Sequence, residues 1–246
     1  MKIRVDLLPH RQPESAYRDV VVLIDVLRSC TVAPLLFDGG LEDLYLSPSL
    51  RRARAFAAQE GALLLGERRG LPPEGFNYGN SPTELGQVDF TGRSVVMVSE
   101  NAPQALPVVS CAQHVLLGSL YNADAVVRRA LALAESEVTL VCSGFGGSED
   151  LDDALTAGYL AARLRQQAPD SNLAGAAPMA VSLLKVFPDP LEALWQSRAG
   201  QTLRQLELQQ DIAVAAFVSQ SERVPQLERQ VELQDSPLFH FGAAVA

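Results

Sequence analysis

Short apolar runs alternate with amphipathic stretches along the first two thirds of the chain. The run Val20–Ile24 contains only valine, leucine and isoleucine and is bounded by Asp19 and Asp25, a pattern typical of a central strand buried on both faces. Further apolar runs at 44–46, 63–65, 94–98, 115–117 and 138–141 predict more strands, and capping residues with helical periodicity predict helices at about 29–39, 49–59, 122–134 and 150–165. This alternation predicts an α/β protein with a mostly parallel or mixed central sheet.

The pattern changes after Pro169. Residues 171–187, 190–199, 201–208 and 210–219 have helical periodicity, whereas only Val224 and residues 231–233 indicate strand. No low-complexity linker precedes these segments, and they are apolar enough to need the sheet as a partner. The sequence therefore predicts a single domain over residues 1–246 with a mainly helical C-terminal third.

Composition narrows the class of partner. The formal net charge of −9 argues against nucleic acid or an anionic membrane as an electrostatic partner, but it leaves room for a small anionic substrate held by local arginines. No apolar run approaches the roughly 20 residues of a membrane span, and the N-terminus lacks the pattern of a secretory signal. Three cysteines without a CxxC spacing are typical of reduced thiols, which predicts a cytoplasmic protein.

The most unusual stretch is 66–82, whose sequence is GERRGLPPEGFNYGNSP. Its glycines and prolines exclude a regular helix. The stretch leaves the carboxyl end of a predicted strand, where open α/β sheets bind ligands, and long irregular loops in compact domains are often functional. The alternative is a surface loop whose glycines and prolines only shape turns.

Polar side chains follow four of the predicted strands: Asp25, Arg28 and Ser29; Glu67 and Arg68; Glu100 and Asn101; and Asp150, Asp152 and Asp153. Several carboxylates with few histidines suit a hard cation such as magnesium, which prefers oxygen ligands. The arginines Arg28, Arg68 and Arg69 offer forked donors for phosphate, sulfonate or carboxylate. The competing interpretation is that these arginines pair with nearby acids on a solvated face.

Known catalytic signatures are absent from the sequence. It contains no P-loop, no GxSxG and no HExxH. Asp25 lacks a second acid two positions later, and no cysteine has an arginine six positions after it. Direct attack of water on a phosphate ester, assisted by a metal ion, therefore fits these residues better than a covalent phospho-enzyme.

The 66–82 loop resembles the signature loop of the 2-phosphosulfolactate phosphatase family, magnesium-dependent hydrolases of coenzyme M biosynthesis. Three further segments are similar to family segments: VVLIDVLRSCT at 21–31, VLLGSLYNADAV at 115–126 and VCSGFGGSEDLDDALTAG at 141–158. The resemblance covers almost the whole chain. It implies a three-layer α/β/α fold and the hydrolysis of a phosphate monoester beside a carboxylate and a sulfonate.

The resemblance also implies site residues, carried over at Asp25, Arg28, Glu67, Arg68, Asn80, Ser81 and Asp153. As a hypothesis, Asp25 and Glu67, with Asp152 or Asp153, hold the magnesium ion. Catalytic roles are assigned to Asp25, Arg28, Glu67 and Arg68. Substrate-binding roles are assigned to Ser29, Arg69, Asn80, Ser81 and Asn101.

Three positions depart from the family pattern. Ser99-Glu100-Asn101 occupies the place of a Thr-Asn-Gly-Thr run, Arg69 replaces a glycine of GERGG, and Ala199 replaces the histidine of an S-x-H-G segment. Two alternatives to the family reaction therefore stay open, namely a phosphatase for another small phosphorylated hydroxy acid and a catalytically silent anion-binding protein. A homodimer is expected only because soluble enzymes often form one.

Overall fold

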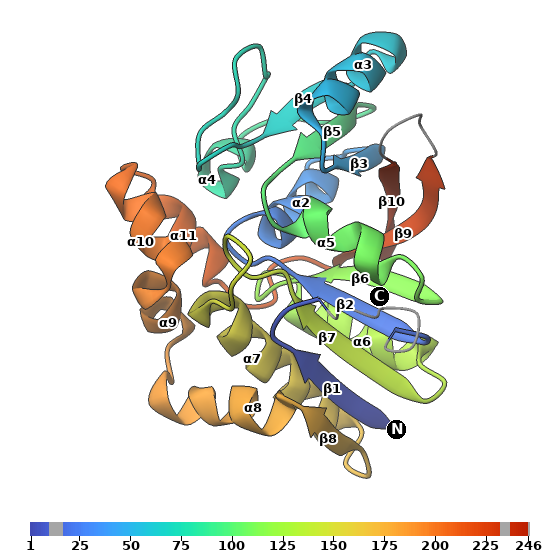
Figure 1. The fold of residues 1–246 in the computed structure, drawn as a ribbon, viewed down its shortest axis with the longest axis vertical. Helices are drawn as coiled ribbons and strands as arrows, with labels where there is room; N and C mark the ends of the chain where they lie inside the picture. Colours follow the sequence, from blue (N-terminus) through green and yellow to red (C-terminus); the bar gives the residue numbers. More distant parts are fainter. Residues whose placement is uncertain (10–16, 232–236, 246) are drawn as a thin grey trace.

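One mixed sheet of ten strands runs through the computed structural model, which describes residues 1–9, 17–231 and 237–245 (Figure 1). From edge to edge the strands are β4 (Leu63–Gly66), β5 (Ser94–Val98), β3 (Asp43–Ser47), β10 (Leu238–Val245), β9 (Arg223–Val231), β6 (His114–Gly118), β2 (Val20–Ile24), β7 (Glu137–Cys142), β1 (Lys2–Asp6) and β8 (Asn172–Gly175).

The sheet consists of two parallel groups joined by an antiparallel hairpin. Strands β4, β5 and β3 form one group, and β6, β2, β7, β1 and β8 form the other. The β9–β10 hairpin lies between them and pairs antiparallel with β3 on one side and with β6 on the other. Because three successive antiparallel pairings separate the groups, the two groups run in opposite directions.

Helices cover both faces of the sheet, as the alternating side chains of β2 show. Val21 and Leu23 pack in one apolar cluster, and Val20, Val22 and Ile24 pack in another on the opposite face. The first cluster includes residues of α2 (Ser29–Asp38), α4 (Pro82–Leu85) and α5 (Ala102–Val109); the second includes residues of α6 (Ala123–Leu133), α7 (Leu151–Gln167) and α8 (Ala177–Val186). The predicted three-layer α/β/α fold is confirmed.

Four further helices complete the layers: α3 (Leu50–Glu60), α9 (Pro190–Gln196), α10 (Arg198–Gln205) and α11 (Gln209–Ala215). Helix α3 packs against Tyr45 and Val96 on β3 and β5. Helices α9, α10 and α11 gather beside the start of α7 (Figure 1). Across the described parts of the chain, no helix has the length and apolar character needed to span a membrane.

The predicted mainly helical C-terminal third is only partly correct. Helices α8 to α11 are present, but β8 lies inside the stretch predicted as helix at 171–187, and β9 and β10 add a long hairpin. β9 was indicated only at its ends because its sequence, RVPQLERQV, is largely polar and contains a proline. Of the short run predicted at 231–233, residues 232 and 233 lie outside the described residues.

Three elements in the first half were not predicted from the sequence, namely β1, the four-residue helix α4 and helix α5. β1 has only two apolar residues, Ile3 and Val5, which are buried on alternate positions of a five-residue strand. Helix α5 contains Pro103 and Pro107 within eight residues, and prolines normally argue against helix. Pro103 is tolerated because it lies in the first turn, where its missing N–H has no helical partner.

Gly66, the last residue of β4, should be required for the backbone conformation at the start of the 66–82 loop. Its φ is +141°, and a Cβ added there would lie 1.9 Å from the carbonyl oxygen of Val98. Gly66→Ala should therefore lower the free energy of unfolding by about 3 kcal/mol or more, measured by urea denaturation.

Gly61→Ala is the matched control, since Gly61 has φ +71° but no atom within 4 Å of an added Cβ. It should cost only about 1 kcal/mol from backbone strain. Equal losses at Gly61 and Gly66 would contradict the close approach to Val98.

Candidate active site

The segments that follow β2, β4 and β5 converge on one pocket. The polar side chains that line it are Asp25, Arg28, Ser29, Glu67, Arg69, Asn80, Glu100, Asn101 and Thr202. The other lining residues are Leu27, Gly70, Phe145, Ala199 and Leu203. Although the two parallel groups of strands run in opposite directions, the segment after β5 crosses to β2, where the Ala102 N–H donates to Asp25 Oδ2 at 2.9 Å. This crossing brings the strand ends together.

Asp25 is the most buried acid of the pocket, only 3% exposed at the end of β2. Burial raises the pKa of its carboxyl from 3.8 to about 6, and the negative charge of Glu67 adds to this effect. Hydrogen bonding from the Ala102 N–H acts in the opposite direction. The pocket therefore holds a carboxyl whose charged form is costly unless a cation lies nearby.

Glu67 is oriented by backbone amides on both of its carboxylate oxygens. Oε1 accepts from the Glu100 N–H at 2.9 Å, and Oε2 accepts from the Gly70 N–H at 2.8 Å. These bonds join the end of β5 to the 66–82 loop through one side chain. Each oxygen keeps a second lone pair, so the carboxylate can still bind a ligand in the pocket.

Arg28 is held in a buried ion pair. Its Nη1 donates to Asp211 Oδ2 on α11 at 2.8 Å, and its Nη2 donates to the Gly70 carbonyl at 2.8 Å. The other oxygen of Asp211 accepts from Ser81 Oγ at 2.6 Å and from the Thr83 N–H at 3.3 Å. One carboxylate thus ties together the turn after β2, the start of α4 and α11.

Sequence reasoning missed Asp211. It follows Gln209 and Gln210 in a polar stretch that is typical of a solvated helix start, and nothing local indicates that it is 1% exposed. Ser81, predicted to bind substrate, instead donates to Asp211 and caps α4 by accepting from the Glu84 N–H at 3.3 Å. It does not line the pocket.

The two arginines of the 66–82 loop lie in different environments. The Arg68 guanidinium donates to the carbonyls of Glu67 and Pro48, both at 3.2 Å, and does not line the pocket. Arg69 lines the pocket, and its N–H donates to Glu100 Oε2 at 3.1 Å. Of these two, the structure therefore brings only Arg69 to the other predicted site residues.

Asp152 and Asp153 are buried at the start of α7 and do not line the pocket. Asp153 accepts from the Val26 N–H at 2.9 Å and from the Gly144 N–H at 3.0 Å, so it braces the turn after β2 against the glycine-rich turn. Burial, followed by the charge of Asp25, raises its pKa to about 8. Burial also raises the pKa of Asp152 well above its ordinary value.

No group of three or more His, Cys, Asp or Glu side chains is placed to hold a metal ion within the described residues. Of the four predicted metal ligands, the structure brings Asp25 and Glu67 to the pocket and leaves Asp152 and Asp153 outside it. The reason is local: the oxygens of Asp153 are occupied by backbone donors that shape the two turns.

Three predicted hydrogen-bonding residues lie in the pocket. Ser29 Oγ donates to Ser99 Oγ at 2.8 Å and accepts from Asn80 Nδ2 at 3.5 Å. Asn80 is 2% exposed, and its Oδ1 has no hydrogen-bond partner among the described residues. Asn101 lines the pocket at the N-terminus of α5. A buried acceptor without a partner is costly, so Asn80 Oδ1 indicates a position for a donor or a cation.

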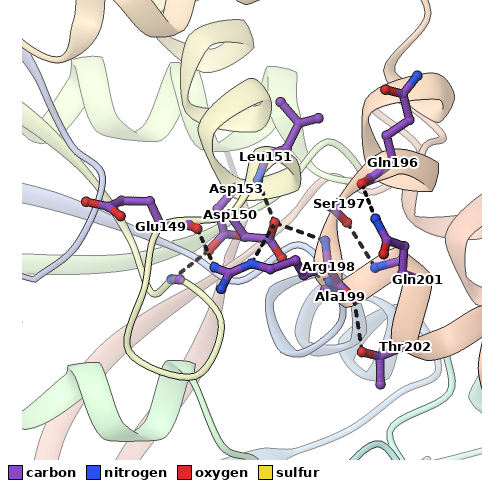
Figure 2. Close-up of polar contacts among 12 residues, drawn as sticks. Glu149, Asp150, Leu151, Asp153, Gln196, Ser197, Arg198, Ala199, Gln201 and Thr202 are labelled. Atoms are coloured by element: carbon purple, nitrogen blue, oxygen red, sulfur yellow. Dashed lines mark hydrogen bonds and ion pairs between the residues drawn. The ribbon is translucent and has the colours of Figure 1, made fainter.

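Helix α10 supplies the remaining wall, and Asp150 fixes its start (Figure 2). Asp150 Oδ1 accepts from the N–H groups of Leu151 and Arg198, and Oδ2 accepts from the Ala199 N–H at 2.9 Å. One carboxylate therefore caps α7 and α10 together. The Arg198 guanidinium lies 5.8 Å from the centre of the Phe145 ring, which also lines the pocket.

Comparison with known proteins agrees with the predicted family. The chain matches the family described as 2-phosphosulpholactate phosphatase over residues 6–230. It belongs to this family.

Curated relatives carry the same description over nearly their whole length. The "Probable 2-phosphosulfolactate phosphatase" of Thermus thermophilus is 42% identical over 235 residues, which cover 94% of this chain and 96% of the relative. The protein of that name from Deinococcus radiodurans is 40% identical over 229 residues, covering 92% and 93%. That from Carboxydothermus hydrogenoformans is 32% identical over 243 residues, covering 97% and 100%.

Removal of Asp211 should destabilise this family member strongly. Asp211→Ala leaves the Arg28 charge buried without its counter-ion, which typically costs about 3–5 kcal/mol. Urea denaturation should show this loss.

The double variant Arg28→Met/Asp211→Leu is the control. It removes both charges of the pair, so its unfolding free energy should lie closer to that of the wild type. A single variant as stable as the wild type would contradict the structural role of the pair.

Proposed function

We propose that this protein is a magnesium-dependent phosphatase that hydrolyses 2-phosphosulfolactate to sulfolactate and inorganic phosphate, the type of reaction that serves coenzyme M biosynthesis. One observation carries the proposal: the family match spans residues 6–230, and its motif residues Asp25, Glu67 and Asn80 meet in one pocket. The three cysteines without a CxxC spacing, a pattern typical of reduced thiols, support the further proposal of a cytoplasmic location.

The donor set of the pocket fits magnesium. Asp25 and Glu67 contribute carboxylates, and Asn80 contributes a buried oxygen that accepts no hydrogen bond from the residues that the structure describes. Magnesium is commonly held by one or two carboxylates together with waters and substrate phosphate, so a third acidic ligand is not required. When bound, the ion would neutralise charge on the phosphate and favour ionisation of a water molecule.

The chain's own residues would bind and orient the ester. Asn101 offers a hydrogen bond to a phosphate oxygen, and Arg69 offers a cation at the same pocket. Ser29 would donate to the phosphate by turning its hydroxyl away from Ser99. Phe145 and Leu203 contribute apolar surface to the same pocket. Exclusion of water by that surface would strengthen the electrostatic interactions of the bound phosphate.

A second candidate is a phosphatase for another small phosphorylated hydroxy acid. Ala199 lines the pocket at the position where the family segment S-x-H-G has histidine, and Glu100 adds a carboxylate. Both changes alter the groups available to the part of the substrate that carries no phosphate. They favour this candidate without changing the reaction type.

The decisive assay is release of inorganic phosphate from racemic 2-phosphosulfolactate, with magnesium and with a chelator. Phospholactate and phosphoglycolate serve as matched esters without the sulfonate. Release that requires magnesium and favours 2-phosphosulfolactate is expected. Equal rates on the three esters would favour the second candidate, and no release from any of them by folded protein would overturn the phosphatase proposal.

Asp25→Asn should abolish turnover and yet stabilise the metal-free protein at neutral pH. The neutral amide lacks the negative charge that the Asp25 carboxylate would contribute to magnesium binding, so phosphate release should be lost. The raised pKa of Asp25 means that the folded state holds its proton more tightly than the unfolded state does. This stabilisation is complete below about pH 4 and disappears as pH rises through about 6.

Relative to the wild type, Asp25→Asn should therefore gain stability as pH rises from about 4 through about 6 and keep a gain of about 3 kcal/mol above that, since each pKa unit corresponds to about 1.4 kcal/mol. Urea denaturation in the presence of a chelator measures this difference. The exposed Asp170→Asn change is the control. Retained turnover in folded Asp25→Asn protein would remove Asp25 from the reaction.

A further inference from the structure

Two arginine side chains line the pocket, and they differ in what holds them. Arg28 is 4% exposed, and its guanidinium is bonded to Asp211 and to the Gly70 carbonyl, each at 2.8 Å. Arg69 is exposed, and its hydrogen bond to Glu100 is made by the backbone N–H. Within the part of the chain that the structure describes, the Arg69 guanidinium has no ion pair or hydrogen bond.

The backbone at Arg69 is set by the turn and not by its side chain. Arg68 and Leu71 exchange backbone hydrogen bonds, and the two residues between them, Arg69 and Gly70, have φ values of +54° and +82°. Such two-residue turns favour glycine, asparagine or aspartate at both central positions. An arginine there costs about 1 kcal/mol of backbone strain, and among the described residues no side-chain hydrogen bond or ion pair of Arg69 offsets this cost.

Among the described residues that line the pocket, Arg69 is the cation whose charge is not offset by an ion pair. Three carboxylates, those of Asp25, Glu67 and Glu100, line the pocket. The charge of Arg28 is already offset by Asp211. These carboxylates would therefore repel a substrate with a phosphate and further anionic groups unless each anionic group lay beside a cation. Among the described lining residues, Arg69 is the one whose guanidinium is still available.

We infer that the Arg69 guanidinium binds the second anionic group of the substrate, its sulfonate or its carboxylate, while the phosphate lies toward Asp25 and Glu67. The inference rests on the proposed phosphatase function and adds a residue that determines specificity within it. A guanidinium suits this role because its planar fork donates two parallel hydrogen bonds to such a group.

Paired variants test the inference. Arg69→Gln removes the cation from the pocket, and Arg204→Gln removes one from the exposed face of α10, where Arg204 lies over Trp195. Phosphate release is measured with 2-phosphosulfolactate and with isopropyl phosphate, which has no second anionic group. Arg69→Gln should lower kcat/KM for 2-phosphosulfolactate about 10- to 100-fold and change that for isopropyl phosphate less than about threefold. Arg204→Gln should change neither.

Arg69→Gly separates recognition from folding. Because glycine accepts the positive φ without strain, this variant should unfold at a temperature equal to or above that of the wild type. It should nevertheless lose the same selectivity as Arg69→Gln. Equal loss on both esters, or no loss on either, would overturn the assignment.

Calorimetric titration with sulfolactate tests this inference separately from the proposed function. Sulfolactate carries the carboxylate and the sulfonate but no phosphate ester, so its binding is measured without any phosphate release. Binding to the wild type that is lost in Arg69→Gln supports the role of Arg69, even if the wild type releases no phosphate. Phosphate release by the wild type, together with unchanged sulfolactate binding in Arg69→Gln, would keep the phosphatase and exclude Arg69.

Discussion

The buried Asp211 carboxylate is the constraint on which the candidate active site depends. It joins Arg28 at the end of β2, Ser81 and Thr83 at the start of α4, and its own helix α11. A buried charge is tolerated only with a counter-ion and hydrogen bonds on its remaining lone pairs, and Asp211 has both. Segments more than 100 residues apart are thereby fixed against each other, so the pocket has one geometry.

A second constraint is the crowding of carboxyl groups around the turn after β2. Asp25 and Asp153 both have raised pKa values, first because both are buried and also because each is close to another acid. At Asp153, the cost of burying the carboxylate is offset by hydrogen bonds from backbone N–H groups of the two turns that it joins. Asp25 faces the pocket, where a bound cation would stabilise its charged carboxylate. The same physical feature, a buried carboxylate, is thus structural at one position and suited to ligand binding at the other.

The pocket combines irregular segments with a rigid frame. Its polar residues follow strands that belong to groups running in opposite directions. The carboxyl ends of these strands therefore do not share one edge of the sheet, and the usual rule for parallel strands does not explain why the polar residues meet in one pocket. Backbone donors to side chains do so instead: the Ala102 N–H holds Asp25, and the Gly70 and Glu100 N–H groups hold Glu67. Helix α10, capped by Asp150, closes the remaining side.

The sequence by itself determined the α/β class, most strands and the presence of Asp25 and Glu67 at strand ends, because these depend on local patterns of burial. The family was predicted from the resemblance of its motifs to those of known members. Only the tertiary structure decided which polar residues face the pocket. Arg68 and Arg69 are adjacent in sequence, yet the positive φ of Arg69 belongs to a turn that brings only that residue to the pocket. Asp211 lies in a polar stretch with no local signal. Its burial arises from packing between distant segments, and such packing leaves no periodicity in the chain.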